Sequence, residues 1–402
     1  MDGEDVQLRA ISVFLGRTQF YMKLTHLFND FFHSEKSGGI VLICCTIVSL
    51  ILANTGFQET YFALWNFEAA GHGVTHWIND GLMTIFFLLI GLELEREIYI
   101  GELSDLRQSM LPIVAAVGGM LLPASIYLIF NYGTPFADGA GIPMATDIAF
   151  ALGVLSLLGN RVPPALKVFL TALAVIDDLG AILVIAVFYT GSIDWLSLSI
   201  ALGIFGALLV LNRLKVHNLI PYLIGGAAMW YFMLHSGVHA TITGVLLAFA
   251  IPFGDGSEKS PSFPLQQWLH KPVAFLILPL FALANTALSI GADWYESLLN
   301  ASSFGIIAGL ILGKPLGILL FSFLAIQMKI AQRPDGIDFR QMAGAGMLGG
   351  IGFTMSIFIT LLALHDQAAI DQSKIAIMIA SVIAGIAGYM TLKFVLDKPS
   401  PA

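Results

Sequence analysis

Long apolar runs alternate with short polar connections along almost the whole chain. Twelve of these runs reach or approach the length of about 20 residues that a helix needs to cross a bilayer. They lie near residues 39–55, 77–93, 110–132, 140–159, 165–189, 195–212, 219–235, 237–252, 268–290, 304–327, 341–364 and 373–396. Only Ser236, Gly237 and their neighbours separate the seventh run from the eighth. The pattern predicts an all-α integral membrane protein with twelve transmembrane helices.

The composition agrees with this fold class. The chain is 57% hydrophobic and 11% charged, against about 25% charged residues in a typical soluble domain. Its formal net charge of -8 comes from acids that the outer connections carry without balancing bases, so the charge indicates no nucleic-acid partner. The expected partner is the lipid bilayer.

Basic residues give an independent prediction of orientation. If both termini are cytoplasmic, 17 of the 19 Lys and Arg residues lie in cytoplasmic segments. Lys374 is then the one basic residue outside, and Lys314 lies within a span. This asymmetry follows the positive-inside rule. We therefore expect a multi-pass membrane protein with both termini in the cytoplasm.

The chain is expected to form one transport domain, residues 38–396, with short cytoplasmic segments at 1–37 and 397–402. Apolar residues recur at helical spacing between Phe20 and Phe31, which predicts a helix lying on the membrane surface. Cys44 and Cys45 are neighbours on the first predicted helix, where they cannot readily form a disulfide. We expect them to pack in the core.

Asp177 and Asp178 occupy the middle of the apolar run at 165–189. A charge at the centre of a membrane helix costs roughly 2.5 to 3.5 kcal/mol on insertion scales, so two such acids indicate an ion site. Lys314 lies equally deep in its own run and needs an acidic partner. That partner is expected from the fifth span, either as a permanent structural ion pair or as a bond that breaks when an ion or a proton loads.

Asp147 is a third buried acid, in a run that Gly141 and Pro143 interrupt. The eleventh run contains the glycine cluster GGIG at 349–352. Helix breaks at these two points would leave backbone groups unpaired unless they line a cavity. Partial charges at the broken helix ends have signs that Asp147 and Lys314 can offset. The alternative for Asp147 is a plain helix cap.

Spans three to five and ten to twelve form comparable triplets, at about residues 110–189 and 304–396. Each has an interrupted helix in second place and a charged helix beside it, and the two triplets are oppositely oriented. Such a pair predicts an inverted repeat whose discontinuous helices, spans 4 and 11, cross near the midplane at a transport site.

Seven short runs together resemble the NhaA family of bacterial sodium/proton antiporters over residues 31–394. They are WIND at 77–80, FFLLIGLE at 86–93, ATDIAFALG at 145–153, AVIDDLG at 174–180, SGVHAT at 236–241, GKPLG at 313–317 and GIGFTMSIF at 350–358. The resemblance implies that Asp178 is the main carboxylate for cation and proton and that Asp177 pairs with Lys314. It places Thr146 and Asp147 where the broken helices cross.

The resemblance also implies exchange of two protons for one Na⁺ or Li⁺, with net movement of charge. A carboxylate binds sodium only when it is ionised, so proton and sodium would compete for the Asp177 and Asp178 site. No cofactor is expected, because Na⁺, Li⁺ and H⁺ are the transported substrates. The resemblance also implies a homodimer, which relatives form through a β-hairpin in the connection at 56–76. That connection is short in this chain, so we expect the hairpin to be missing or reduced, and the homodimer stays open.

Four further residues are candidates for ion attraction or pH response. Glu93 and Glu97 share one helix face and are expected to form an acidic cytoplasmic funnel, or else a solvated helix end. His239 and His270 are candidates for a pH response, although His239 could equally be a hydrogen-bonded core residue. Asp80, near the outer end of the second span, could line the path or cap a helix.

Three other classes of function fit the sequence less well. An intramembrane aspartic protease fits poorly, because Asp177 and Asp178 diverge by about 100° on one helix. A passive cation channel is disfavoured because the sequence contains no filter-like carbonyl loop, and because Lys314 beside the path would oppose cation conduction. A sodium-coupled symporter of an organic solute is the nearest alternative, and it predicts flux that depends on that solute.

Overall fold

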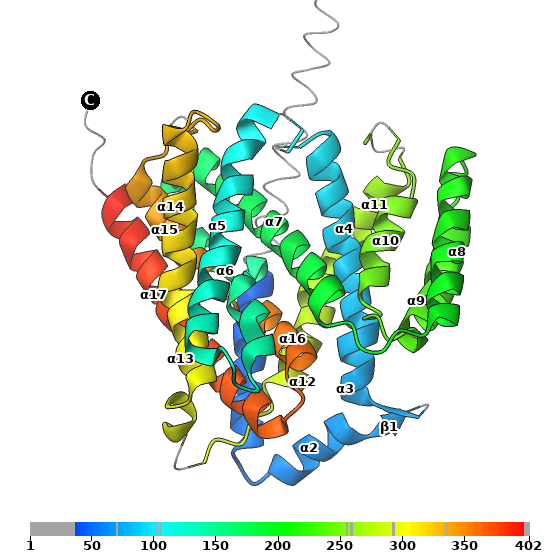
Figure 1. Ribbon diagram of the computed structural model, residues 1–402, viewed down its shortest axis with the longest axis horizontal. Coiled ribbons are helices and arrows are strands. Elements are labelled where there is room, and N and C mark those ends of the chain that lie inside the picture. The colour runs from blue at the N-terminus through cyan, green and yellow to red at the C-terminus, as the bar shows by residue number, and fades with distance from the viewer. Residues whose placement is uncertain are drawn as a thin grey trace, which may run out of the picture.

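Helices packed roughly side by side make up most of the described residues (Figure 1). The computed structural model describes residues 37–397, except 70, 102, 105, 255, 258–259, 292–293 and 335. The surface helix expected within residues 1–37 and most of the 397–402 tail lie outside these described residues.

The helix bounds follow the apolar runs closely. In chain order the helices are Ser37–Ala53, α2 Gln58–Asn66, α3 Val74–His76, α4 Met83–Tyr99, α5 Leu106–Asn131, α6 Ile148–Ser156, α7 Pro164–Phe188, α8 Trp195–Arg213, α9 Ile220–His235, α10 Ile242–Ala250, α11 Ser262–Pro272, α12 Leu278–Asn285, α13 Ala301–Ala308, α14 Lys314–Gln327, α15 Phe339–Gly349, α16 Phe353–Ala363 and α17 Gln367–Leu396.

Short 3₁₀ and π-helical turns extend several of these helices. Wider π-helical turns join α3 to α4, α11 to α12 and α13 to α14, at Trp77–Leu82, Val273–Ile277 and Gly309–Gly313. Tighter 3₁₀ turns occur at Ala137–Met144, Gly159–Arg161 and Glu296–Leu298. A π-helical turn holds an extra residue and is frequent at functional sites.

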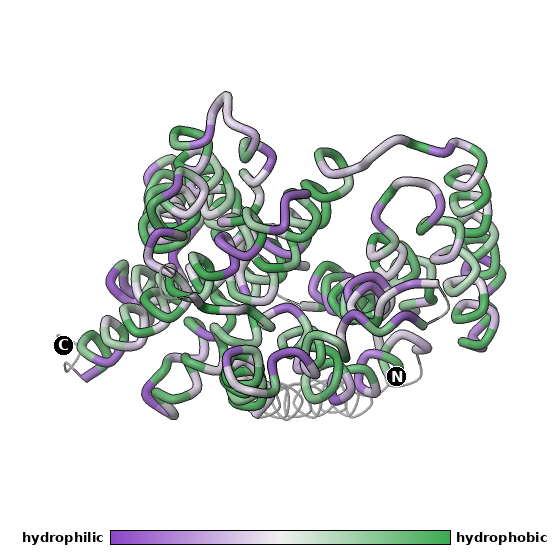
Figure 2. The backbone as a smooth tube through the Cα atoms, turned by 90° about the horizontal axis from the view of Figure 1, so that it is seen from below, coloured by the Kyte–Doolittle hydropathy of each residue, from purple (hydrophilic) through white to green (hydrophobic). Residues whose placement is uncertain are grey.

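Eight helical segments within the described residues are long and apolar enough to cross a membrane, or up to ten if each of two bent pairs is one span. The protein is therefore a multi-pass membrane protein of the all-α class. Four of the twelve predicted runs fall short. Two correspond to α9 and α10, which have 16 and 9 residues, and two correspond to the bent pairs, Ser37–Ala53 with α2 at 116° and α15 with α16 at 48°. Figure 2 shows hydrophobic residues along most of the helices.

The connection between Ala53 and Val74 carries structure that the apolar pattern did not predict. Helix α2 lies across the lower end of the bundle in Figure 1, and it is followed by the two-residue strands β1 Glu68–Ala69 and β2 His72–Gly73. The strands pair antiparallel, with Glu68 opposite Gly73. The hairpin is thus present in a very short form.

Close helix packing surrounds the middle of the molecule. Helix α14 lies along α5, and a Cβ added at Gly118 or at Gly317 would overlap the carbonyl oxygen of the other residue. Only glycine permits this backbone approach. The contact brings the start of α14, and with it Lys314, against α5.

The helix Ser37–Ala53 contradicts one prediction about the cysteines. Cys44 is exposed and Cys45 is partly exposed, and both are free thiols. The expected core packing is wrong for Cys44, because its face of the helix points away from the bundle.

Candidate ion-binding site

The two adjacent aspartates lie in the middle of α7, an uninterrupted helix that begins with Pro164 at its first turn. Both side chains are buried, with Asp177 1% and Asp178 0% exposed. Neighbouring residues on a helix point about 100° apart. The two carboxylates therefore meet different surroundings.

Asp177 faces α14. Its Oδ2 atom lies 2.9 Å from Lys314 Nζ, and both side chains are fully buried. The Thr146 hydroxyl is also within hydrogen-bond distance of Asp177 Oδ2, at 2.7 Å, and lies 3.0 Å from the Gly349 carbonyl oxygen. The predicted ion pair between Lys314 and an aspartate of the fifth span is present, and Asp177 is the partner.

Asp178 has no such partners. Within the described residues, neither of its carboxyl oxygens accepts a hydrogen bond, and the same is true of Asp177 Oδ1. Three buried carboxyl oxygens from adjacent residues are therefore free to bind. Oxygen ligands of this type suit hard cations and protons. An ionised carboxylate would be very costly to leave unpaired at such a place.

Two interruptions in helical structure meet beside this pair. Helical hydrogen bonding ends at Met144 and resumes at Ile148, and α15 and α16 meet at a 48° bend. The amide of Asp147 donates to the Ile351 carbonyl oxygen at 2.7 Å, which holds the two interruptions together. A Cβ at Gly350 would overlap the Leu310 carbonyl oxygen, so glycine is required there.

Asp147 bridges two helix starts. It caps α6 by accepting from the Phe150 amide at 3.0 Å, and it accepts from the Thr354 amide at 3.0 Å and from the Thr354 hydroxyl. The N-termini of α6 and α16 both carry partial positive charge, so one carboxylate offsets two helix ends. The cap and the charge compensation, posed as alternatives from the sequence, are the same contact.

Lys314 contacts a helix C-terminus, whereas Asp147 contacts helix N-termini. Its ammonium donates to the Met144 carbonyl oxygen, the last residue of the 3₁₀ segment, as well as contacting Asp177. Exposed carbonyls at a helix C-terminus carry partial negative charge. The lysine thus contacts a negative helix end and a carboxylate, and the π-helical turn Gly309–Gly313 directly precedes it.

Glu93 and Glu97, the candidate funnel, lie in the C-terminal half of α4, away from the β1–β2 hairpin. His270 Nε2 is 3.5 Å from Glu93 Oε1, and both side chains are largely buried. They line a small cavity with Ile148, the first residue of α6. Glu97 lies one turn further along α4 and is half-buried. The structure therefore joins Glu93 to His270, a contact that sequence reasoning did not predict.

The remaining candidates lie elsewhere. His239 is half-buried, and its Nε2 atom is 2.8 Å from the Tyr189 carbonyl oxygen at the end of α7. Sequence reasoning also missed Glu95, which is 4% exposed and whose buried Oε2 atom has no hydrogen-bond partner among the residues that the structure describes. The sequence pattern that could have identified Glu95 is its place on the apolar face of α4, together with Leu88 and Leu92.

The fold and the buried charges define a multi-pass helical membrane protein with an acid and base centre inside its spanning region. The chain belongs to the Na+/H+ antiporter 1 family, whose model matches residues 29–392. It is 64% identical over 375 residues to Na(+)/H(+) antiporter NhaA 1 of Flavobacterium johnsoniae and 63% identical over 375 residues to Na(+)/H(+) antiporter NhaA of Flavobacterium psychrophilum. Each alignment covers 93% of this chain and 98% of the relative. A third relative, Na(+)/H(+) antiporter NhaA of Cytophaga hutchinsonii, is 60% identical over 94% of this chain and 98% of its own length.

Proposed function

We propose that the protein is a secondary active antiporter that extrudes Na⁺ or Li⁺ in exchange for protons. The observation that carries this proposal is the buried Asp178 carboxylate beside Asp177, since neither of its oxygens has a hydrogen-bond partner in the part of the chain that the structure describes. Family membership and the names of the relatives support the same activity. Its role would be sodium and pH homeostasis.

Competition for one carboxylate is sufficient to couple the two fluxes. Asp178 can bind a sodium ion only when ionised, and it becomes neutral by binding a proton. Each loaded form lacks a net negative charge and can change its exposure from one side of the membrane to the other, whereas the empty charged form is held back by the cost of burial. Sodium leaving on one side and protons entering from the other then follow from a single site.

Asp177 would serve as the gating neighbour of Asp178. Its Oδ1 atom is free to join a cation held by Asp178, while its Oδ2 atom is occupied by Lys314 and Thr146. Loading a cation on the two carboxylates weakens the attraction that holds Lys314. Two titrating acids and one base allow two protons per sodium ion, which makes the exchange electrogenic.

Asp147 and Lys314 would stabilise the broken helices at the centre without themselves binding the transported cation. Asp147 offsets the N-termini of α6 and α16, and Lys314 offsets the carbonyl end at Met144. Glu93 and Glu97 would attract cations toward this centre from the cytoplasm, and His270, which contacts Glu93, would adjust the charge of that carboxylate. His239 and His270 stay candidates for the pH response of transport.

The architecture we propose has twelve spans, with α9 and α10 as short spans and Ser37–Ala53 as the first. Residues 38–396 form one domain containing an inverted repeat, about 110–189 and 304–396, whose discontinuous helices cross near the midplane. The 1–37 and 397–402 segments lie in the cytoplasm, and the protein resides in the bacterial inner membrane. Homodimerisation stays a prediction, to which strands of two residues would contribute little area.

Everted membrane vesicles with an acid interior test the proposed function. We expect sodium or lithium added to the bath to drive alkalinisation of the interior, recorded by dequenching of a pH dye, with no organic solute present. Asp178→Asn should abolish the response, and the exposed-lysine variant Lys393→Met should keep it. No response of the inserted wild-type protein at any pH would contradict antiport, and a response that needs an organic solute would indicate a symporter.

A further inference from the structure

The 3₁₀ segment Ala137–Met144 is unusually long for this kind of helix. It holds eight residues, whereas 3₁₀ runs of more than three or four residues are uncommon, because their hydrogen bonds have poorer geometry than those of an α-helix. The Met144 carbonyl oxygen, at its end, accepts from Lys314. Two residues later, the Thr146 hydroxyl lies 2.7 Å from Asp177 Oδ2. Contacts from other helices are therefore needed to hold these groups of the site in place.

The hydroxyl of Tyr189 holds this segment at two points. It donates to the Asp138 carbonyl oxygen at 2.8 Å and accepts from the Gly141 amide at 3.1 Å. A Cβ added at Gly141 would overlap the hydroxyl, so glycine is required for this contact. The backbone of Tyr189 is fixed in turn, because its carbonyl oxygen lies 2.8 Å from His239 Nε2 and its amide donates to the Ile185 carbonyl oxygen. A shift of Tyr189 would therefore move the segment with it.

Two further helices hold the same stretch of backbone. Tyr127 of α5 donates to the Phe136 carbonyl oxygen at 2.8 Å, and its hydroxyl lies 3.0 Å from that of Ser302. Ser356 of α16 donates to the Ile142 carbonyl oxygen at 2.7 Å. The segment is thus tied at successive points to α5, α7 and α16, which all pack against it.

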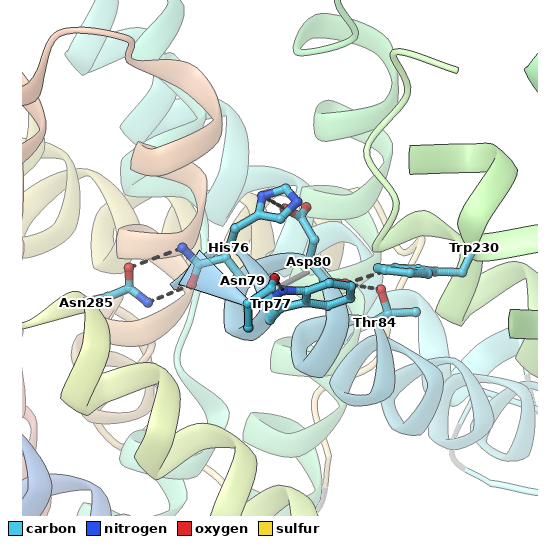
Figure 3. Close-up of polar contacts among 8 residues, drawn as sticks. His76, Trp77, Asn79, Asp80, Thr84, Trp230 and Asn285 are labelled. Atoms are coloured by element: carbon cyan, nitrogen blue, oxygen red, sulfur yellow. Dashed lines mark hydrogen bonds and ion pairs between the residues drawn. The ribbon is translucent and has the colours of Figure 1, made fainter. Parts of the chain in front are cut away.

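Side chains from neighbouring residues and helices also hold another irregular stretch, the π-helical turn Trp77–Leu82 (Figure 3). The Asp80 carbonyl oxygen in that turn accepts from the Thr84 hydroxyl at 2.5 Å and from the Trp230 indole N–H at 3.2 Å. The ordinary purpose of such contacts is to satisfy backbone groups that lack a regular helical partner. Tyr189 differs because it belongs to the helix that carries the two aspartates of the site.

Tyr189 directly follows α7, and Asp178 lies in the middle of that helix. The 11 residues from Asp178 to Tyr189 correspond to about three helical turns, so the two residues lie on nearly the same face. The helix between them is uninterrupted. The Tyr189 hydroxyl therefore links the carboxylates of α7 to the 3₁₀ segment that leads to Thr146.

We propose that the Tyr189 hydroxyl is a positioning group for cation binding, which ties the 3₁₀ segment to α7 and so keeps Thr146 within reach of Asp177 and Asp178. The proposal rests on the proposed antiport function. The Thr146 hydroxyl oxygen is a hard ligand of the kind that suits a sodium ion. If the segment loosens, this oxygen moves away from the carboxylates, which weakens sodium binding more than it slows the movement of the bound ion.

A purely structural role for Tyr189 makes a different prediction. If the hydroxyl only stabilises the end of α7, Tyr189→Phe lowers the thermal unfolding temperature and the amount of folded protein, while the KM for sodium of the remaining protein is unchanged. A positioning role instead raises the KM and leaves the maximal rate nearly unchanged. The phenylalanine keeps the ring and its packing, so the two roles can be separated in one variant.

The experiment measures sodium-driven proton movement in everted vesicles against sodium concentration, at one fixed pH, together with calorimetric sodium binding to the purified proteins at the same pH. Wild type is compared with Tyr189→Phe, Gly141→Ala and the double variant. Tyr61→Phe is the matched control, because the Tyr61 hydroxyl also donates to a backbone carbonyl oxygen, that of Leu283 at 2.8 Å, but belongs to α2. If Tyr189→Phe does not insert, Gly141→Ala decides alone, since it displaces the same hydroxyl.

We expect Tyr189→Phe to raise the KM and the Kd for sodium about three- to tenfold, as for the loss of one or two hydrogen bonds, with a maximal rate within about twofold of wild type. Gly141→Ala should raise both constants at least as much. The double variant should be no worse than Tyr189→Phe, because loss of the hydroxyl makes room for the methyl group. Tyr61→Phe should behave as wild type.

Unchanged KM and Kd values in Tyr189→Phe, an equal rise in Tyr61→Phe, or additive effects in the double variant would overturn the positioning role and leave antiport intact. The absence of sodium-driven proton movement in the wild type would contradict the antiport function itself. The calorimetric Kd values would then still decide whether Tyr189 positions a sodium site.

Discussion

At the scale of single residues, the site depends on which of two neighbouring acids faces the buried lysine. The sequence predicts that Lys314 needs an acidic partner from α7, but Asp177 and Asp178 differ only by about 100° around the helix axis. The rotation of α7 against α5 and α15 decides between them, and it arises from packing along the whole helix. In the structure Asp177 contacts Lys314, and both oxygens of Asp178 lack a hydrogen-bond partner among the described residues.

Breaking this buried pair should destabilise the protein. Lys314→Met leaves Asp177 without its cation, and a one-sided loss of a buried ion pair typically costs about 3–5 kcal/mol. We expect a clear fall in the thermal unfolding temperature in detergent, measured by size-exclusion chromatography after heating. Adding Asp177→Asn should restore much of the loss, because position 177 then carries no charge that needs Lys314.

The exposed Lys393 of α17 provides the control for that cycle, since Lys393→Met removes a lysine from the surface and should have little effect. Additive losses from Lys314→Met and Asp177→Asn would contradict direct pairing of the two side chains.

At the scale of elements, helix starts and close crossings position the charges. The glycine and proline residues of the fourth and eleventh runs predicted interruptions, yet their location follows from hydrogen bonding that the sequence does not reveal. Pro143 lies inside a 3₁₀ segment, and the chain leaves helical geometry only after Met144. The break ends at Asp147 because its carboxylate caps α6 while it also holds α16.

Removing the Asp147 carboxylate should therefore weaken two helix starts at once. Asp147→Ala loses every acceptor, at about 1 kcal/mol for each cap, whereas Asp147→Asn keeps an acceptor and loses only the charge. We expect faster hydrogen exchange at the starts of both α6 and α16 in the alanine variant. The start of α8, which Asp194 caps independently, serves as the internal reference, and faster exchange at α6 alone would contradict the bridge.

The crossing of α5 and α14 should be equally sensitive. Gly317→Ala places a methyl group against the Gly118 backbone, which forces the helices apart one turn from Lys314. We expect lower thermal stability and at least a several-fold loss of sodium-driven proton movement. Gly206→Ala, on α8 where a Cβ meets nothing within 4 Å, should leave both unchanged, and an equal effect of the two variants would argue against close packing as the cause.

At the scale of the whole molecule, hydrophobicity predicts the membrane class and most helices, because burial in lipid imposes length and apolarity on each span. It did not predict α2, whose sequence mixes polar and apolar residues, or the exposure of Cys44. It also missed the Glu93 and His270 contact, because α4 and α11 are far apart in the chain and only the fold brings them together.

The proposed twelve-span topology can be tested with single cysteines in a variant lacking Cys44 and Cys45. An impermeant maleimide added to intact cells should label Ser192→Cys and His235→Cys, and it should label Asn218→Cys only after permeabilisation. All three positions are exposed. Labelling of Asn218→Cys and His235→Cys from the same side would show that α9 does not cross the membrane.

The central claim is that sodium and protons compete for the Asp178 carboxylate. Its most direct test is sodium binding to the purified protein, followed calorimetrically across pH together with the protons released. We expect the Kd for sodium to rise by about tenfold per pH unit of acidification for each proton displaced, with proton release on binding and neither effect in Asp178→Asn. Sodium binding that does not depend on pH, or that persists unchanged in Asp178→Asn, would contradict the account.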